Sequence, residues 1–317
     1  MSAASAVPGA RTGGAAVAAA RPAAAPQWDA LLAAAAPLWR ACAACAHRCG
    51  VDRAAGARGL CGAGPAPAVY NEIIQLGEEI DLVPTYMVLF AGCDLRCAYC
   101  SEGREVDDPE RGARLDEAGV TALAARVRAA AGPRGPAPRP RFVTFVGGEV
   151  TVHLEPLLRV LRALDGVLPA VLVTNLHATP EALALLVPAV HAFVADLKFG
   201  PDGACARAVA RVDRYWEVVT ANLAAVAPAR PLTVRHLLMP GHVACCAAPA
   251  LAHAGALARA HDRVRANLMT TYQPLHRAAG QPLLGRRPGA AELGEALALA
   301  RAALPKGRLL VDGVPDA

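Results

Sequence analysis

The sequence predicts an α/β fold: a full or partial (β/α) barrel of about six βα units, preceded by an N-terminal cysteine-rich metal-binding segment. Two observations predict it. From residue 86 onward, short apolar runs alternate with longer segments of helical periodicity. Before that point, four cysteines lie close together. Repeated strand–helix alternation indicates a parallel sheet, either curled into a barrel or open in doubly wound form. In both cases functional residues lie at the carboxyl ends of the strands.

Three segments are expected along the chain. Residues 1–26 form a flexible Ala-rich tail, residues 27–80 form the cysteine-rich segment, and residues 81–317 form the barrel domain. Trp28–Trp39 is apolar at helical spacing, so a helix is predicted just before the first cysteine.

The elements of the barrel domain follow from their periodicity. Strands are predicted from short apolar runs: Met87–Ala91, Phe142–Val146, Ala170–Thr174, Ala192–Leu197, Leu232–Leu238 and Arg265–Thr271. Helices are predicted where apolar residues recur at helical spacing after Asp, Thr-Pro or Pro signals: Asp116–Ala131, Leu154–Leu164, Pro180–Val190, Ala204–Ala225 and Ala247–Ala260. The segment Gly132–Pro140 is expected to be a surface loop, and a helix near Ala290–Leu304 and the run Leu309–Val311 close the chain.

Composition and charge narrow the classes of protein to consider. Hydrophobic residues make up 55% of the 317 residues, which supports a buried core. The net charge of +5 comes from scattered arginines, so no basic stripe for nucleic acid is expected. No strongly apolar run of about 18 residues predicts a membrane span, and no secretory signal is evident. We therefore expect a cytoplasmic protein, in which ten cysteines bind metal or do redox chemistry rather than form disulfides.

Three cysteines directly follow the first predicted strand. Cys93, Cys97 and Cys100 have the spacing C-x3-C-x2-C, in a loop at the carboxyl end of Met87–Phe90. Thiolates bind iron–sulfur clusters, and three of them can hold three irons of a cubane and leave the fourth iron open to a substrate. The alternative is a zinc site completed by Asp94 or a distant histidine.

A cysteine quartet precedes this motif. Its four soft ligands suit tetrahedral zinc or a second iron–sulfur cluster, and intervening glycines permit the turns that bring the last ligand back. With the spacing C-x2-C-x3-C-x11-C, they are Cys42, Cys45, Cys49 and Cys61. The adjacent pair Cys245–Cys246 opens a helix, and at least one of the two is expected to lie in the core.

Polar residues and glycines end the next two strands. Gly147 and Gly148 allow the backbone to approach a ligand closely, and the Glu149 carboxylate can accept hydrogen bonds from an ammonium group. Thr174 and Asn175 follow the third strand, where they either contact a ligand or cap the next helix.

Charged residues end the fourth and fifth strands. Asp196 and Lys198 place opposite charges on one face, as a functional pair or as a surface ion pair. Strand alternation allows only one of Arg235 and His236 to face the interior, and Arg235 is preferred because its fork suits carboxylates. His242 is expected in a loop over the barrel mouth.

The cysteine motif, with Tyr99 before its third cysteine, resembles the signature of the radical S-adenosylmethionine (SAM) superfamily. Further segments resemble the uncharacterised subgroup of that superfamily related to pyruvate formate-lyase activating enzyme. They are Cys42–Gly62, Val194–Gly200 (VADLKFG), Val234–His242 (VRHLLMPGH) and Tyr272–Pro274.

This resemblance implies cofactors and roles. A [4Fe-4S] cluster on Cys93, Cys97 and Cys100 would bind SAM, with Gly147-Gly148-Glu149 as the family's GGE motif that holds the methionine amino group. Val150 stands where proline often follows that motif. The residues expected to contact SAM are Tyr99, Gly147, Gly148, Glu149 and Asn175. Those expected to act in catalysis are Asp196, Lys198 and Arg235. Of these, Asp196-Leu197-Lys198 resembles the D-x-K motif of glycyl-radical-enzyme activases.

The expected function is reductive cleavage of SAM to a 5′-deoxyadenosyl radical that abstracts hydrogen, with activation of a glycyl-radical protein as the sharper hypothesis. The resemblance implies an electron donor such as flavodoxin or ferredoxin, and a protein substrate as a further partner. Neither a membrane nor a nucleic acid is expected as a partner. The alternative is a non-catalytic electron-transfer protein that binds an iron–sulfur cluster or another metal.

Overall fold

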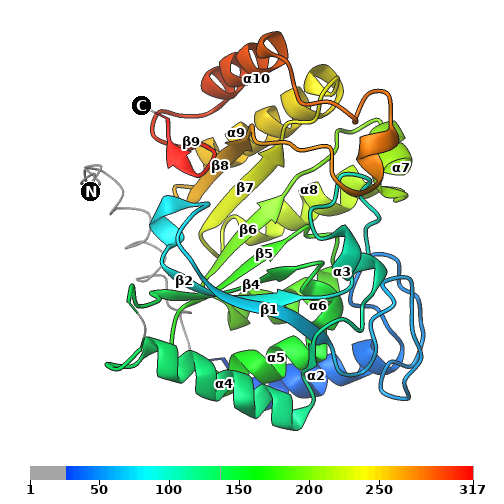
Figure 1. The fold of residues 1–317 in the computed structure, drawn as a ribbon, viewed down its shortest axis with the longest axis vertical. Coiled ribbons are helices and arrows are strands. Elements are labelled where there is room, and N and C mark those ends of the chain that lie inside the picture. The colour runs from blue at the N-terminus through cyan, green and yellow to red at the C-terminus, as the bar shows by residue number, and fades with distance from the viewer. Residues whose placement is uncertain (1–25, 136, 317) are drawn as a thin grey trace.

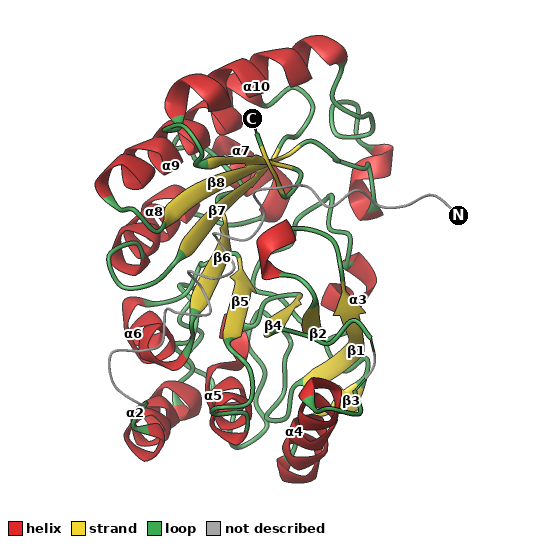
Figure 2. Cartoon of the chain, turned by 90° about the vertical axis from the view of Figure 1, so that its left-hand side faces the viewer, coloured by secondary structure: helices red, strands yellow, loops and turns green. Residues whose placement is uncertain are grey.

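The computed structural model describes residues 26–135 and 137–316. The expected tail, residues 1–26, lies outside them except for its last residue. In the described part, a ten-stranded sheet runs through the molecule, and most helices line one side of it (Figures 1 and 2). Its strand order is β10-β9-β8-β7-β6-β5-β4-β2-β1-β3.

The central strands are parallel, and each lies beside the preceding one in the chain. They were all predicted within a few residues of their ends: β2 (Thr85–Phe90), β4 (Phe142–Gly147), β5 (Ala170–Thr174), β6 (Ala192–Asp196), β7 (Leu232–Leu237), β8 (Val264–Met269) and β9 (Leu309–Val311). Parallel strands carry apolar residues on both faces because helices or loops cover both. Their continuous Val, Leu and Phe runs are the reason that the sequence revealed them.

Antiparallel strands occupy the two ends of the sheet. β1 (Ala68–Gln75) pairs with β2 and with β3 (Ala113–Arg114), and β10 (Val314–Pro315) pairs with β9. Since β3 and β10 lie at opposite ends of the order, the sheet stays open. The predicted α/β fold is therefore confirmed in its partial-barrel form. The sequence did not predict β1, in which Ala68 and Val69 are buried and the following residues are partly or fully exposed.

One helix precedes the first strand, and the others lie in the connections between strands. The helices are α2 (Trp28–Arg40), α3 (Gly103–Asp107), α4 (Glu117–Ala131), α5 (Leu154–Ala163), α6 (Pro180–Ala189), α7 (Ala204–Ala210), α8 (Tyr215–Val226), α9 (Ala248–Ala260) and α10 (Ala290–Ala303). The single helix predicted over residues 204–225 is wrong. Arg211 and Arg214 have φ angles of 56° and 53°, a left-handed conformation that ends α7 and separates it from α8.

The cysteine-rich segment docks on the helices near the carboxyl end of β5. α2 packs against α5 and α6, and an isolated bridge joins Cys45 to Ala178. The Ala46 amide donates to the His177 carbonyl at 2.9 Å. The Thr179 hydroxyl, which caps α6, donates to the Ala43 carbonyl at 2.6 Å. These bonds fix the segment against the loop that follows β5.

One helical stretch of the described chain meets the length and apolarity of a membrane span. Val243–Ala260 covers 18 residues with a mean hydropathy of 1.3, and 44% of it is buried inside the molecule. Its α9 portion packs against β7, β8 and α10. It is thus an integral part of the layer of helices over the sheet.

Candidate active site

One cavity at the carboxyl ends of the parallel strands brings the predicted barrel residues together. Its volume is about 370 Å³, within the range of small-molecule sites. Its walls include every residue that the sequence predicted as a cluster ligand, SAM contact or catalytic group: Cys93, Cys97, Tyr99, Cys100, Gly147, Gly148, Glu149, Asn175, Asp196, Lys198 and Arg235. Residues more than 140 positions apart in the chain therefore share one site.

The loop after β2 holds the three cysteines in a buried setting with several hydrogen-bond donors. The Leu95 amide lies 3.4 Å from the Cys93 sulfur, and the Asn175 side-chain amide lies 3.8 Å from it. Burial raises the pKa of Cys97 to about 12 and the pKa of Cys93 well above its usual range. Buried thiols of this kind become thiolates only beside a cation, which a bound metal centre supplies.

Gly147 and Gly148 bring the end of β4 against the loop that carries the cysteines. Gly147 has a φ of +127°, and a Cβ atom there would lie 2.3 Å from the nitrogen and oxygen of Phe90. A Cβ at Gly148 would lie 2.0 Å from the Gly92 oxygen. The close approach that requires glycine is thus between two backbone segments. As a result the backbone of both residues faces the cavity beside the cysteines.

Glu149 is buried with a carboxylate that four donors orient. Its Oε1 accepts from the amide and hydroxyl of Thr151 and from the hydroxyl of Thr174, at 2.7–2.9 Å. Its Oε2 accepts one hydrogen bond, from the Asn175 amide at 2.7 Å, and so keeps capacity for a further donor. Burial, followed by the charge of Asp94, raises the pKa of Glu149 to about 7. An ammonium group in the cavity would favour its ionised form.

Asp94 anchors the loop that carries the three cysteines, a role that sequence reasoning missed. The Asn175 side-chain amide donates to its Oδ1 at 2.8 Å, and His177 Nδ1 lies 2.9 Å from its Oδ2. Burial alone would raise the pKa of Asp94, but the hydrogen bond and charge of His177 hold it below the usual value. The nearby His47 ring donates to the Asp94 carbonyl at 2.9 Å. Asp94 therefore ties the cysteine loop to the loop after β5 and to the cysteine-rich segment.

Asn175 contacts this network and the cavity, while the cap of the following helix is Thr179. The sequence left two roles open for Asn175, contact with a ligand and capping of the next helix. In the structure Asn175 does not cap that helix. Its position next to Asp94 in the chain of hydrogen bonds gave no local signal in the sequence.

Asp196 and Lys198 form an ion pair in the cavity wall. Lys198 Nζ lies 2.5 Å from Asp196 Oδ2, and both side chains are about one-fifth exposed. The buried Tyr215 hydroxyl donates to the Asp196 carbonyl at 2.7 Å and accepts from the Lys198 amide at 2.9 Å. Burial would lower the pKa of Lys198, but the Asp196 carboxylate raises it well above its usual range. The pair is thus fixed and charged, and Lys198 also lowers the pKa of the Cys97 thiol.

Arg235 faces the cavity, and His236 faces away, with its Nδ1 2.7 Å from the Leu197 carbonyl. The guanidinium is already engaged by acidic residues of this chain. It donates to both carboxylate oxygens of Glu79 at 3.0 and 2.6 Å, and to Glu78 at 3.1 Å. Arg235 therefore braces the wall of the cavity through Glu79 instead of presenting a free fork to a substrate carboxylate. Glu78 and Glu79 belong to the turn before β2, which the sequence did not connect with β7.

The cysteine quartet lies beside the cavity and contains a buried arginine. Arg53 is 0% exposed, stacks 3.9 Å over the Trp39 ring, and donates to the carbonyls of Val152 and Gly64 at 2.8 and 3.0 Å. Its Nη1 lies 3.8 Å from the Cys61 sulfur. Among the described residues no carboxylate pairs with it, and its Nε has no partner.

A buried guanidinium requires a compensating charge, and cysteine thiolates are the groups at hand. Arg53 lowers the pKa of the Cys61 thiol against the larger effect of burial, which raises it. The donor set of Cys42, Cys45, Cys49 and Cys61 therefore fits an anionic metal–thiolate centre.

His242 and the cysteines after it lie elsewhere. His242 is buried and is not among the residues that line the cavity, in contrast to its expected place over the mouth. It lies beside Cys205 and Cys245. Cys246 is fully buried, in agreement with the expectation that one of the pair belongs to the core.

The known proteins that this chain resembles are only distantly similar to it. No family model matches the chain. An uncharacterized protein of Methanocaldococcus jannaschii is 28% identical over 270 residues, which are 83% of this chain and 75% of that protein. Among solved structures, Streptococcus suis SuiB bound to S-adenosylmethionine is similar over 69% of this chain, with 14% identity and a TM-score of 0.47. This chain spans 47% of that SuiB chain, about half of its length.

A domain of pyruvate-formate lyase-activating enzyme from Bacteroides vulgatus is similar over 53% of this chain and 97% of its own, with 21% identity and a TM-score of 0.42. Both solved structures are under 25% identical to this chain and have TM-scores under 0.5. At such identities and scores they carry no conclusion about chemistry, which comes from the residues of the site.

Proposed function

We propose that this chain is a radical SAM enzyme in which Cys93, Cys97 and Cys100 hold a [4Fe-4S] cluster and the adjoining cavity binds S-adenosylmethionine. The observation that carries the proposal is the meeting of these thiols and the Glu149 carboxylate in the walls of one cavity of about 370 Å³. When reduced, such a cluster supplies the electron that cleaves SAM into methionine and a 5′-deoxyadenosyl radical, which abstracts hydrogen from a substrate.

The spacing of the thiols supports a cluster over a single zinc ion. Two zinc-bound thiolates lie about 3.8 Å apart, from a Zn–S distance of about 2.3 Å in a tetrahedron. Among the described residues, the sets of three potential ligand atoms within 4.8 Å of one another are Cys205–His242–Cys245 and His47–Asp94–His177. Cys93, Cys97 and Cys100 are not among these sets, so their three sulfurs do not all lie within the reach of one tetrahedral zinc ion.

The chain's own residues would bind and orient the cofactor. Glu149 Oε2, which accepts only the Asn175 amide, offers a lone pair to the amino group of SAM. The backbone of Gly147 and Gly148 borders the same space. Tyr99 packs at 5.7 Å between ring centroids against Tyr272, and both rings border the cavity, where they exclude water.

We further propose that the radical acts on a protein substrate, as in the activation of a glycyl-radical protein. The support is the fixed Asp196–Lys198 pair in the cavity wall and its resemblance to the D-x-K motif. The pair offers one cation and one anion to backbone amide groups of a bound peptide. An electron donor such as flavodoxin or ferredoxin belongs to the same proposal.

Anaerobic reconstitution with iron and sulfide, followed by dithionite and SAM, tests the activity by chromatography of 5′-deoxyadenosine. We expect formation by the wild type and none by Cys97→Ala. Glu149→Gln should keep its iron and lose SAM affinity, while the matched control Glu181→Gln, at an exposed ion pair with Arg48, should behave as the wild type.

A fully loaded wild-type cluster that neither binds nor cleaves SAM would refute the proposal. That outcome would favour the alternative, a non-catalytic electron-transfer protein with an iron–sulfur cluster, which does not require a carboxylate such as Glu149 in the cavity wall.

A further inference from the structure

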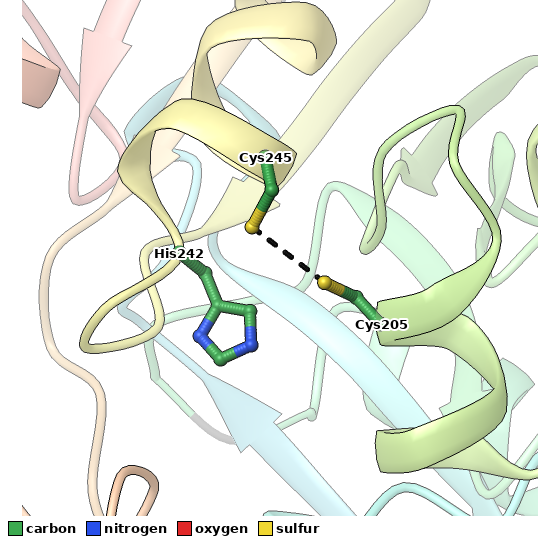
Figure 3. Close-up of side chains that lie close together, drawn as sticks. All are labelled: Cys205, His242 and Cys245. Carbon is green, nitrogen blue, oxygen red and sulfur yellow. Dashed lines mark hydrogen bonds between the residues drawn. The ribbon is translucent and has the colours of Figure 1, made fainter.

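A group of three metal-ligating side chains lies outside the cavity, between two neighbouring loops. Cys205 is in α7, after β6, and His242 and Cys245 follow β7. Their ligand atoms all lie within 4.8 Å of one another. Figure 3 shows the three side chains converging from these two segments. Cys205 and Cys245 belong neither to the quartet nor to the group Cys93, Cys97 and Cys100, which together use seven other cysteines.

The distances between the sulfur atoms match those around one tetrahedral ion. The Cys205 and Cys245 sulfurs are 3.5 Å apart, and the Cys245 and Cys246 sulfurs are 3.7 Å apart. The expected separation around zinc is about 3.8 Å, whereas a disulfide requires about 2.05 Å. The buried Cys246 sulfur is outside the set of atoms that all lie within 4.8 Å of one another, so the converging ligands are Cys205, His242 and Cys245.

The histidine is oriented as a metal ligand. His242 Nδ1–H donates to the Pro240 carbonyl at 2.8 Å, which leaves Nε2 as the nitrogen available to a metal. A backbone carbonyl on the other ring nitrogen is the usual partner of a metal-bound histidine, because it fixes both the tautomer and the ring plane. The His242 ring is only 8% exposed, so this orientation is fixed by packing.

Local backbone features build the group. Val243–Ala247 forms a π-helical turn before α9, a rare geometry that occurs frequently at functional sites. Gly200, after β6, lies against this turn: a Cβ atom there would be 1.7 Å from the Cys245 oxygen. Glycine at this position therefore allows the loop after β6 to approach the π-helical turn closely enough for Cys205 to reach Cys245.

We propose that Cys205, His242 and Cys245 form a zinc site that fastens α7 to the turn before α9. Cysteine thiolates and a histidine nitrogen are common ligands of tetrahedral zinc, whose fourth position can hold water. Cys205 and Cys245 are partly exposed, which gives the ion a path of entry. The site is independent of SAM chemistry and rests on its own geometry.

Its consequence reaches the active site through α7. The carbonyls of Ala210 and Val209, at the end of α7, accept hydrogen bonds from the amides of Arg96 and Ala98 at 3.0 and 2.8 Å. Arg96 and Ala98 are the residues on either side of Cys97 in the C-x3-C-x2-C loop. Zinc at Cys205 would thus hold the helix on which that loop rests.

The test measures zinc and iron per chain in the full-length protein by elemental analysis, for the wild type, Cys205→Ser and His242→Asn. Asparagine can keep the hydrogen bond to the Pro240 carbonyl through its side-chain amide but has no atom at the Nε2 position. His253→Asn is the matched control, since His253 is a half-buried histidine of α9 that packs on Trp216 outside the group.

We expect both site variants to contain one zinc equivalent less than the wild type, with unchanged iron, and His253→Asn to match the wild type. Equal zinc in all four proteins would overturn the proposal, and so would a Cys205–Cys245 disulfide in peptides of the unreduced protein.

If the variants do not fold, X-ray absorption at the zinc edge of the wild type decides. A nitrogen ligand at about 2.0–2.1 Å beside sulfur at about 2.3 Å supports the site, because the quartet offers only sulfur. Sulfur alone, or no zinc, refutes it.

Discussion

Replacement of Arg53 by methionine probes the charge of the cysteine quartet. Methionine keeps an apolar side chain against Trp39 but removes the guanidinium and its hydrogen bonds to two buried carbonyls. Removing one partner of a buried charge pair costs about 3–5 kcal/mol. At about 2 °C per kcal/mol for a domain of this size, the metal-loaded protein should melt about 6–10 °C lower. Arg53→Lys keeps the charge without the fork and should fall between the two.

The same substitution should have a different effect once the metal is removed. In the metal-free protein the thiols of Cys45 and Cys61 are protonated, because burial raises their pKa above the usual range. Arg53 is then an uncompensated buried cation, so its removal costs only the hydrogen bonds to two buried carbonyls, and methionine should destabilise the metal-free protein less than the loaded one.

Calorimetric melting of wild type and variant, each with metal and after chelation, measures both effects. The reasoning is refuted if Arg53→Met melts within 2 °C of the wild type in the loaded state and retains its metal. It is also refuted if the loss of stability is equal in both states, since the thiolate charge would then play no part.

Three further predictions concern the scaffold of the site. Gly147→Ala should abolish cluster loading because the new Cβ overlaps Phe90, whereas Gly77→Ala, which meets nothing within 4 Å, should load normally; iron analysis of both checks this. Burial lowers the pKa of His153 to about 3. Below pH 6.5 this histidine is therefore protonated in the unfolded chain but not in the folded protein, so the free energy of unfolding should fall by about 1.4 kcal/mol for each pH unit. His153→Gln should reduce that slope in urea titrations between pH 7 and 5, and an unchanged slope would assign it to other groups. Asn222→Leu leaves two buried carbonyls of the loop after β5 without donors, so the urea unfolding free energy should drop by about 2–4 kcal/mol, and a drop under 1 kcal/mol would contradict this.

The parts of the fold that the sequence predicted are those with a local signal. The buried parallel strands are continuous apolar runs, and the cysteine spacing and Gly147-Gly148-Glu149 are visible within a few residues. β1 was missed because Tyr70, Asn71 and Glu72 interrupt its apolar residues, so it shows no continuous apolar run. The break between α7 and α8 was missed because nothing in the composition around Arg211 distinguishes it from the helices on either side.

The residues of the site that were missed depend on partners far apart in the chain. The Glu79 carboxylate engages Arg235 across 156 positions, and Asp94 engages His177 across 83. No spacing rule connects such pairs, because the sheet topology alone brings them together. The roles of Arg235 and Asp94 therefore emerged only from the assembled structure.

The docking of the cysteine-rich segment sets an order for events on the ribosome. The Ala46 amide donates to the His177 carbonyl. The cysteine-rich segment can therefore dock on the loop after β5 only when about 130 more residues have been synthesised after Ala46. At about 5–20 residues per second, that interval lasts roughly 7–26 s. During it four thiols are open to oxidation and to whichever soft cation arrives first. Supply of the correct metal to the nascent chain, rather than affinity in the finished protein, would then decide what this centre contains.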